Sequence, residues 1–488
     1  MQLLCTSFMQ KNIMPNSFAS EAIKGVSWTL IEKTVVQTLA VITLILLARF
    51  LEPTDFGLIG LLILFFALSN VIVTSGLGSA LIQKNDVTTE DYSTVFYLNI
   101  AIAATLYAGL YFLAPCLANY FNEEQLVYIA RVYFVVILFN SLTIVPIAKF
   151  KIELNFQIVS KIEVLATLLA SVAAILAAAY GANAWSLVIQ SITQSFVRAL
   201  LLLYCAGGIV PSLTFTKRAF YRLFGFGSRL LVTGISSTTA NNLHQVMIGK
   251  HYSISDVGHY TQSIQATNAI SGIVTNIVNV VALPILSKIK TDKARLNDTY
   301  QQAFSLTALI TFPLMFGFAA IADSFVHIFL SEKWAPTIPI LKTLSVAASL
   351  IPIGAINLSM LAASGRADLY LRTEIAKLPV SIILLIAAIP YGTLAIACSV
   401  LLSRMTGFCI NAYYPGRLYD FGFLRQLKQI FPTILAASIM YITVSLIELP
   451  HETKYLLVRI GIGITTFAFS AYILKAPGIG KIYDISPR

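Results

Sequence analysis

The sequence predicts an all-α polytopic membrane protein with about fourteen transmembrane helices, built as two six-helix lobes and a C-terminal helix pair. Of its 488 residues, 57% are hydrophobic and only 11% are charged, whereas about 25% of a typical soluble protein is charged. The apolar residues gather in runs of about 20, the length at which a helix crosses about 30 Å of hydrocarbon. This composition excludes a disordered chain, a nucleic-acid-binding domain with a solvated surface and an ordinary soluble enzyme.

Fourteen apolar runs follow one another along the chain. The first 24 residues show no charged segment followed by a short apolar run and a cleavage site, so we expect a cytoplasmic tail at 1–24. The longest outer loops, near 115–125 and 323–337, leave no room for a soluble catalytic domain. The predicted spans are 28–50, 56–78, 92–114, 126–147, 162–180, 184–206, 223–248, 261–286, 300–322, 338–362, 370–390, 392–414, 430–448 and 454–474.

Lysine and arginine residues predict the orientation, because membrane proteins carry an excess of them on cytoplasmic loops. With the N-terminus in the cytoplasm, 22 of the 33 basic residues lie in inner segments, Lys377 among them, and seven lie within spans. The outer side then carries only four, namely Arg49, Lys250, Lys333 and Lys454. This asymmetry accounts for the net charge of +11 and places both termini in the cytoplasm.

An internal repeat divides the chain into two halves. Glu-Pro-Thr-Asp-Phe-Gly at 52–57 follows the first span, and Ser-Ile-Ser-Asp-Val-Gly at 253–258 follows the seventh. Tyr-Gly before the sixth span also recurs before the twelfth. Six spans is an even number, so the halves share one topology and are related by an axis along the membrane normal. The predicted units are an N-lobe at 25–206, a cytoplasmic linker at 207–222, a C-lobe at 223–414 and the C-terminal pair with its tail at 415–488.

Charged residues inside the spans are candidates for a functional site, because a charge in hydrocarbon is costly. Arg198 lies deep in the sixth span, and Arg404 lies near the centre of the twelfth, the equivalent helix. Both helices are short of acidic partners, so we expect Arg404 to line a cavity; pairing with helix carbonyls is the alternative. Glu32 and Lys33 lie about a turn into the first span and are candidates for ion coupling, with snorkelling to the inner interface as the alternative.

Amide and imidazole side chains predict a polar stripe on the seventh and eighth spans. They recur at a spacing of three to four residues, which places them on one face of each helix. Lipid would leave so many polar groups without partners, so they must face a cavity or other helices. Their number favours a wet cavity over packing alone. The stripe residues that we expect to contact a ligand are Asn241, His244, Gln265, Asn268 and Asn276.

No motif for nucleotide or metal chemistry accompanies this stripe. The sequence contains no Walker A motif, so we do not expect the chain to hydrolyse ATP. Its five cysteines include no Cys-x-x-Cys pair, and its five histidines show no metal-ligand spacing. We therefore expect no cofactor and no bound metal.

Several stretches of the first half resemble the polysaccharide exporters of the Wzx type. They read RFLEPTDFGLIG from Arg49, SGLGSALIQKNDVTTEDYSTVFYLNI at 75–100, LAPCLANYF at 113–121 and YGANAWSLVIQ at 180–190. The similarity is greatest to the O-antigen and lipopolysaccharide flippase branch that contains colanic-acid and teichuronic-acid exporters. It covers about residues 25–210, and the second half adds only the span count and the repeat.

This resemblance implies a fold and a function. The family belongs with the MATE drug antiporters and the lipid II flippases, which implies a MATE-like fold of two lobes around a central cavity. It also implies flipping of undecaprenyl-pyrophosphate-linked oligosaccharide across the bacterial inner membrane by alternating access, with H⁺ or Na⁺ as a candidate coupling ion. The expected partners are that lipid-linked oligosaccharide, membrane lipids and, as candidates, other polysaccharide-assembly membrane proteins; no nucleic acid is expected.

The predicted polar residues suit such a substrate. Arg198 and Arg404 can hold a pyrophosphate through charge-assisted hydrogen bonds, and the amides of the stripe can contact sugars. A MATE-type drug antiporter is one alternative, but it needs buried acids, and Glu32 is the only interior candidate. A membrane polysaccharide polymerase is a less favoured alternative, because we expect it to use a sizeable outer loop. The sequence therefore favours a transporter over an enzyme.

Overall fold

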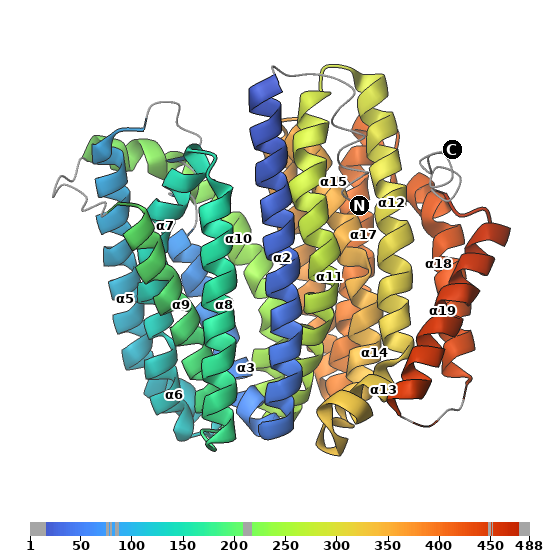
Figure 1. The fold of residues 1–488 in the computed structure, drawn as a ribbon, viewed down its shortest axis with the longest axis horizontal. Helices are drawn as coiled ribbons and strands as arrows, with labels where there is room; N and C mark the ends of the chain where they lie inside the picture. The colour runs from blue at the N-terminus through green and yellow to red at the C-terminus, as the bar shows by residue number, and fades with distance from the viewer. Residues whose placement is uncertain are drawn as a thin grey trace.

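The computed structural model consists of helices packed side by side (Figure 1). It describes residues 16–74, 87–207, 217–447 and 452–477, together with residues 78, 81, 82 and 450. These residues contain no strand, and they form 13 helical segments long and apolar enough to cross a membrane, which confirms the all-α polytopic class. The helices are α2 (Asn16–Phe50), α3 (Pro53–Thr74), α5 (Thr89–Phe121), α6 (Gln125–Tyr133), α7 (Val135–Ile152), α8 (Phe156–Ala179), α9 (Trp185–Cys205), α10 (Lys217–His251), α11 (Ile254–Lys288), α12 (Lys293–Ala320), α13 (Ala322–Phe325), η1 (Val326–Leu330), η2 (Glu332–Trp334), α14 (Thr337–Ala348), α15 (Leu350–Ala363), α16 (Ala367–Ala388), η3 (Ile389–Tyr391), α17 (Thr393–Tyr419), α18 (Phe423–Ser445) and α19 (Thr453–Ile473).

The predicted spans correspond to these helices, with two refinements. Two spans are each formed by a pair of consecutive helices, α6 with α7 and α14 with α15. Pro352 lies in the first turn of α15, where a missing N–H removes no intrahelical hydrogen bond. The seventh span lies in α10, which is 35 residues long but carries part of the polar stripe and is not among the 13 segments.

The predicted tail and linker fall partly outside the described residues, at 1–15 and 208–216. The helices next to them begin earlier than hydropathy predicts. α2 begins at Asn16, inside the predicted tail, and α10 begins at Lys217, inside the predicted linker. A helix that extends beyond the hydrocarbon can be polar there, so its first turns carry no apolar signal. The division into lobes stays a prediction.

The two copies of the repeated motif form similar turns at the starts of α11 and α3. At α11, the Ser253 hydroxyl accepts the Asp256 N–H at 3.1 Å, and the Asp256 carboxylate accepts the Ser253 N–H at 3.1 Å. This reciprocal pair is a capping box, which satisfies N–H groups that the helix leaves free. At α3, the Asp55 carboxylate accepts the Glu52 N–H at 2.9 Å. The sequence repeat therefore corresponds to a repeated local structure.

The glycine at the end of each motif allows α3 and α11 to cross in backbone contact. A Cβ on Gly57 would lie 2.1 Å from the carbonyl oxygen of Ile254, and a Cβ on Gly258 would lie 1.8 Å from that of Pro53. Each glycine thus faces the backbone of the other copy of the motif. A reciprocal contact of this kind is expected of two repeats related by a pseudo-twofold axis.

Helices α10 and α11 join the two halves of the chain. α11 packs along α2 and α3 on one side and along α12, α14 and α15 on the other. α10 packs against α3 and α16. The C-terminal helices α18 and α19 pack against each other, and α18 also packs against α12 at the edge of the bundle (Figure 1).

Trp334 ties three helices together at one end of this interface. Its side chain is fully buried, and its indole N–H donates to the Ala48 carbonyl at 2.8 Å. Its ring meets Phe56 and His259 edge-on, with centroids 5.3 and 5.7 Å away. These partners lie on α2, α3 and α11. The short helix η2, which carries Trp334, therefore packs against both halves of the chain. In the predicted orientation this is the outer end.

The glycine crossing predicts a specific sensitivity to added volume. Gly57→Ala or Gly258→Ala places a methyl group against a backbone carbonyl that cannot rotate away. We expect each change to cost about 1–3 kcal/mol of stability and to lower the apparent melting temperature of the purified protein. Gly109→Ala on α5 is the control, because nothing lies within 4 Å of its Cβ. Equal melting temperatures for all three variants would contradict a close backbone crossing.

Candidate functional site

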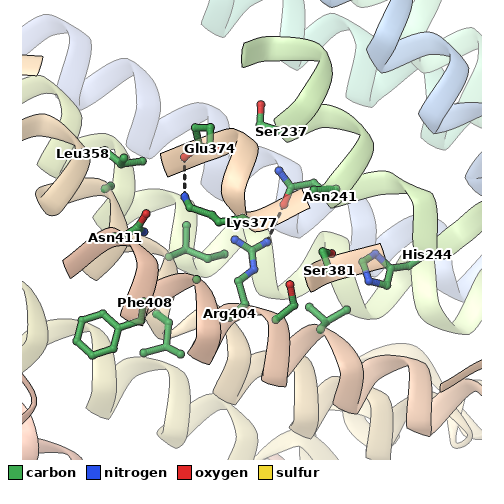
Figure 2. A pocket seen from close by; sticks show the side chains of 18 of the residues that line it. Ser237, Asn241, His244, Leu358, Glu374, Lys377, Ser381, Arg404, Phe408 and Asn411 are labelled. Carbon is green, nitrogen blue, oxygen red and sulfur yellow. Dashed lines mark hydrogen bonds and ion pairs between the residues drawn. The ribbon is translucent and has the colours of Figure 1, made fainter. Parts of the chain in front are cut away.

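A cavity of about 220 Å³ lies among α10, α11, α15, α16 and α17 (Figure 2). All its lining residues belong to the second half of the chain, within 223–414. The resemblance to exporters implies a cavity between the halves, whereas this cavity lies inside one of them. Its polar lining consists of Ser237, Asn241, His244, Tyr260, Glu374, Lys377, Ser381, Ser403, Arg404 and Asn411.

Two cations and one carboxylate make up the charged lining. Arg404, on α17, donates from Nη2 to Asn241 Oδ1 on α10 at 3.0 Å. Lys377, on α16, donates from Nζ to Glu374 Oε1 at 2.6 Å. Figure 2 shows the guanidinium directed toward Asn241, and Arg404 also interacts electrostatically with Lys377 and Glu374. The charged side chains of this lining therefore leave one positive charge unbalanced.

Three further lining residues have polar atoms without a hydrogen-bond partner in the part of the chain that the structure describes. Both ring nitrogens of His244 are buried and have no hydrogen-bond partner among the described residues. The same holds for the Tyr260 hydroxyl and for Oδ1 of Asn411. The His244 and Tyr260 rings lie nearly parallel, with centroids 6.4 Å apart. Buried polar groups normally have partners, so these atoms indicate that a ligand or water completes the lining.

Three of the predicted site residues meet in this cavity. Arg404, Asn241 and His244 all line it. The other stripe residues lie on α11 outside its lining: Gln265 and Asn276 are partly buried and Asn268 is exposed. The stripe is therefore divided between the cavity wall and another face of α11.

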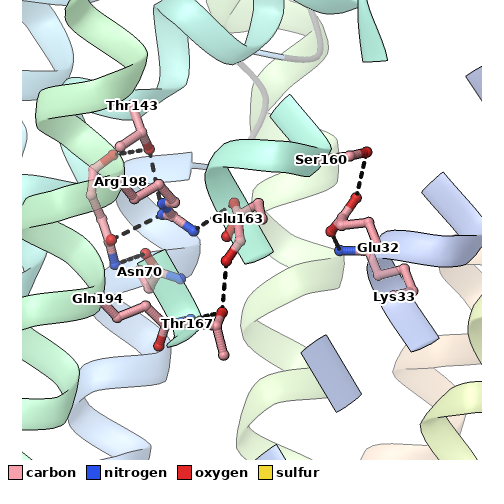
Figure 3. Close-up of polar contacts among 10 residues, drawn as sticks. Glu32, Lys33, Asn70, Thr143, Ser160, Glu163, Thr167, Gln194 and Arg198 are labelled. Atoms are coloured by element: carbon pink, nitrogen blue, oxygen red, sulfur yellow. Dashed lines mark hydrogen bonds and ion pairs between the residues drawn. The ribbon is translucent and has the colours of Figure 1, made fainter. Parts of the chain in front are cut away.

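Arg198 lies in a separate polar cluster within the first half (Figure 3). Its guanidinium pairs with Glu163 on α8 at 3.2 Å and donates to Asn140 Oδ1 on α7 at 3.0 Å. Asn140 in turn donates to Asn70 on α3 at 3.3 Å. Arg198 is thus neutralised by a carboxylate and does not line the cavity that contains Arg404.

Glu32 and Lys33 pair with each other at 3.0 Å on α2. Glu32 is buried and also accepts the Ser160 hydroxyl of α8 at 3.2 Å, whereas the Lys33 side chain is 44% exposed (Figure 3). The Glu32 carboxylate therefore lies between α2 and α8, whereas the Lys33 ammonium lies at the surface of the helix bundle.

The structure corrects one expectation about charge. Glu32 is not the only interior acid, because the side chains of Glu163 and Glu374 are also largely buried. The helices α9 and α17 that carry Arg198 and Arg404 contain no acid, as expected, and each arginine has one of these glutamates near it on a neighbouring helix, α8 or α16. Pairing with a cation lowers the cost of burying a carboxylate, which is how both acids are accommodated within spans.

The count of basic residues predicts that Lys377 lies on the inner side, yet it lines the cavity from within α16. A count of basic residues on each side of the membrane cannot distinguish a lysine in a loop from one that lies a few turns into a helix. The spacing does carry a signal: Glu374 and Lys377 are three residues apart, and Arg404 and Asn411 are seven apart, which places each pair on one helix face. The lining offers cationic, amide and hydroxyl groups for recognising a ligand.

The sequence is similar to proteins of polysaccharide assembly. The model of a family described as polysaccharide biosynthesis protein matches residues 46–339. The teichuronic acid biosynthesis protein TuaB of Bacillus subtilis is 25% identical over 393 residues, 78% of each chain. The lipopolysaccharide biosynthesis protein WzxC of Escherichia coli is 23% identical over 365 residues, 74% of each chain. The succinoglycan biosynthesis transport protein ExoT of Rhizobium meliloti is 25% identical over 337 residues, 69% of this chain and 68% of its own.

The fold is similar to those of two kinds of transporter. The lipid II flippase MurJ in an inward closed conformation superposes with a TM-score of 0.76 at 16% identity, covering 91% of this chain and 98% of its own. An inward-facing multidrug resistance MATE family transporter superposes with a TM-score of 0.64 at 14% identity, covering 81% and 98%. The predicted MATE-like architecture is therefore confirmed at the level of fold.

The Arg198–Glu163 pair can be measured with a double-mutant cycle. Because each side chain neutralises the other inside the bundle, we expect Arg198→Met and Glu163→Gln to be coupled by about 0.5–3 kcal/mol of stability. Unfolding of the purified single and double variants measures this coupling. The exposed Arg366–Asp368 pair, with side chains 46% and 51% exposed, is the control and should show little coupling. A coupling near zero for Arg198 and Glu163 would contradict an internal ion pair.

Proposed function

Because the chain belongs to the polysaccharide biosynthesis protein family, we propose that it is a flippase for a lipid-linked oligosaccharide. It moves an undecaprenyl-pyrophosphate-linked oligosaccharide across the bacterial inner membrane by alternating access, for the assembly of a surface polysaccharide. The names of TuaB, WzxC and ExoT connect relatives of this chain to such polysaccharides. The fold shared with a lipid II flippase supports a mechanism in which two halves rock about a bound head group.

The observation that carries this proposal is the surplus positive charge in the cavity. Arg404 and Lys377 face a single carboxylate, that of Glu374, so an anion is the ligand that balances the lining. Charge-assisted hydrogen bonds from these two side chains suit phosphate oxygens. The cavity volume of about 220 Å³ is below the roughly 300–1,000 Å³ of drug-sized ligand pockets. It therefore admits the diphosphate, while the sugars and the lipid tail lie outside it.

The proposed orientation has both termini in the cytoplasm. The Trp334 contact then lies at the outer end, and the loops rich in basic residues lie at the inner end. No cofactor takes part in this proposal. Coupling to H⁺ or Na⁺ is compatible with it, and the lipid-linked substrate and the surrounding lipids are its partners.

A drug antiporter fits the cavity less well. A cationic drug requires an uncompensated acid, whereas Glu374, the one carboxylate of the lining, is paired with Lys377. A polymerase fits less well too, because the segments between the described helices are short, and the longest on the predicted outer side contains only the short elements α13, η1 and η2. The flippase therefore remains the preferred function.

Replacing Arg404 tests the anion site. Arg404→Ala removes a charged hydrogen-bond donor worth about 1.5–3 kcal/mol, so we expect binding of a prenyl diphosphate sugar to weaken about tenfold to a hundredfold. Surface polysaccharide should be lost from a deletion strain carrying this variant, at unchanged protein level in the membrane. Arg131→Ala is the control, because Arg131 stacks on Tyr111 at 4.2 Å and does not line the cavity. Normal polysaccharide from Arg404→Ala cells would refute the role of Arg404.

Cysteine labelling tests the orientation. In a variant without native cysteines, Glu332→Cys places a thiol at a side-chain position that is 85% exposed, on the proposed outer side. Arg366→Cys places one at a 46% exposed position on the proposed inner side. A membrane-impermeant maleimide added to spheroplasts should label the first variant and not the second. The opposite pattern would invert the proposed topology.

A further inference from the structure

The ion pair of Glu374 and Lys377 lines the cavity in which the proposed anion binds. The two side chains lie one turn apart on α16, are 11% and 21% exposed, and are joined at 2.6 Å. We infer that binding of a diphosphate in this cavity is linked to the uptake of one proton by the Glu374 carboxylate. This inference rests on the proposed function and assigns a coupling residue to it.

The first step is a competition for one ammonium group. A diphosphate held by Arg404 lies next to Lys377, because both basic side chains line the same small cavity and interact electrostatically. The flexible lysine stem allows its ammonium to leave Glu374 for the phosphate oxygens. The glutamate then loses its 2.6 Å partner and lies near a dianion instead.

The surroundings decide what the released carboxylate does. From α17 it faces Arg404, which the diphosphate now engages, and Tyr370 lies near it on α16. From α10 and α11 the titratable lining residues are His244 and Tyr260. The residues that α15 contributes to the lining are all apolar. Burial next to an anion disfavours the charged form of a carboxylate, so Glu374 takes a proton from solvent onto the oxygen that Lys377 leaves.

Charge balance favours the same outcome. A diphosphate diester carries two negative charges, and Arg404 and Lys377 carry two positive charges. With Glu374 neutral the occupied cavity is balanced, whereas with Glu374 charged it holds one excess negative charge inside the bundle. An uncompensated charge in low dielectric is costly, so the neutral acid is the form that accompanies the bound dianion.

Calorimetry of the purified full-length protein measures the linkage. The probe is a short-chain prenyl diphosphate sugar, a diester that lacks the phosphate ionisation near neutral pH of a monoester. Titrations in two buffers with different protonation enthalpies give the number of protons taken up on binding. We expect about one proton for the wild type and about none for Glu374→Gln. Asp323→Asn is the matched control: it breaks the Asp323–Lys342 pair, also 2.6 Å long but outside the cavity, and should keep the uptake.

The outcomes separate the two proposals. Equal proton uptake by Glu374→Gln and the wild type, or binding by the wild type without uptake, would overturn the linkage while leaving the anion site intact. A wild type that does not bind the probe would remove the anion site, and the linkage with it. If Glu374→Gln does not fold, Glu374→Met serves instead. Its thioether cannot take up a proton, so its uptake should also be near zero.

Discussion

Charges placed inside a membrane-crossing bundle need partners, and this requirement organises the polar interior of the protein. Where a carboxylate meets a guanidinium directly, as Glu163 meets Arg198, the pair is balanced and packs within the first half. In the second half, Glu374 pairs with Lys377, and Arg404 lines the same cavity. These two cations and one carboxylate leave one positive charge in the cavity. In the proposed function, an anionic ligand balances this residual charge.

The two clusters are variations of one arrangement. Glu163 and Glu374 lie on the fifth helix of their halves, α8 and α16, and Arg198 and Arg404 lie on the sixth, α9 and α17. In the first half the arginine reaches the glutamate at 3.2 Å. In the second half Lys377 holds the glutamate, so the arginine turns to Asn241 instead. The cluster of the second half therefore differs by one additional lysine and carries one positive charge more.

The helices and the repeat could be predicted from the sequence because both depend on local information. An apolar run sets a span, and Asp55 and Asp256 set the same turn wherever the motif occurs. The pairs between helices depend on how far α8 lies from α9, or α10 from α17, which no local pattern records. For this reason Arg404, Asn241 and His244 could each be predicted as a polar residue within a span, whereas the contact of Arg404 with Asn241 and the partner of Arg198 could not.

Three consecutive residues at the start of α11 connect the cavity to the contact between halves. Gly258 contacts the Pro53 backbone of α3, and the His259 ring packs edge-on against Trp334. Tyr260 lines the cavity, and its hydroxyl has no hydrogen-bond partner among the described residues. Successive residues of a helix point about 100° apart, so one turn of α11 touches all three places at once. A shift of α11 against α3 therefore moves the wall that carries Tyr260. The cavity wall and the contact with Trp334 therefore share one turn of α11, so a movement of this turn changes both places together.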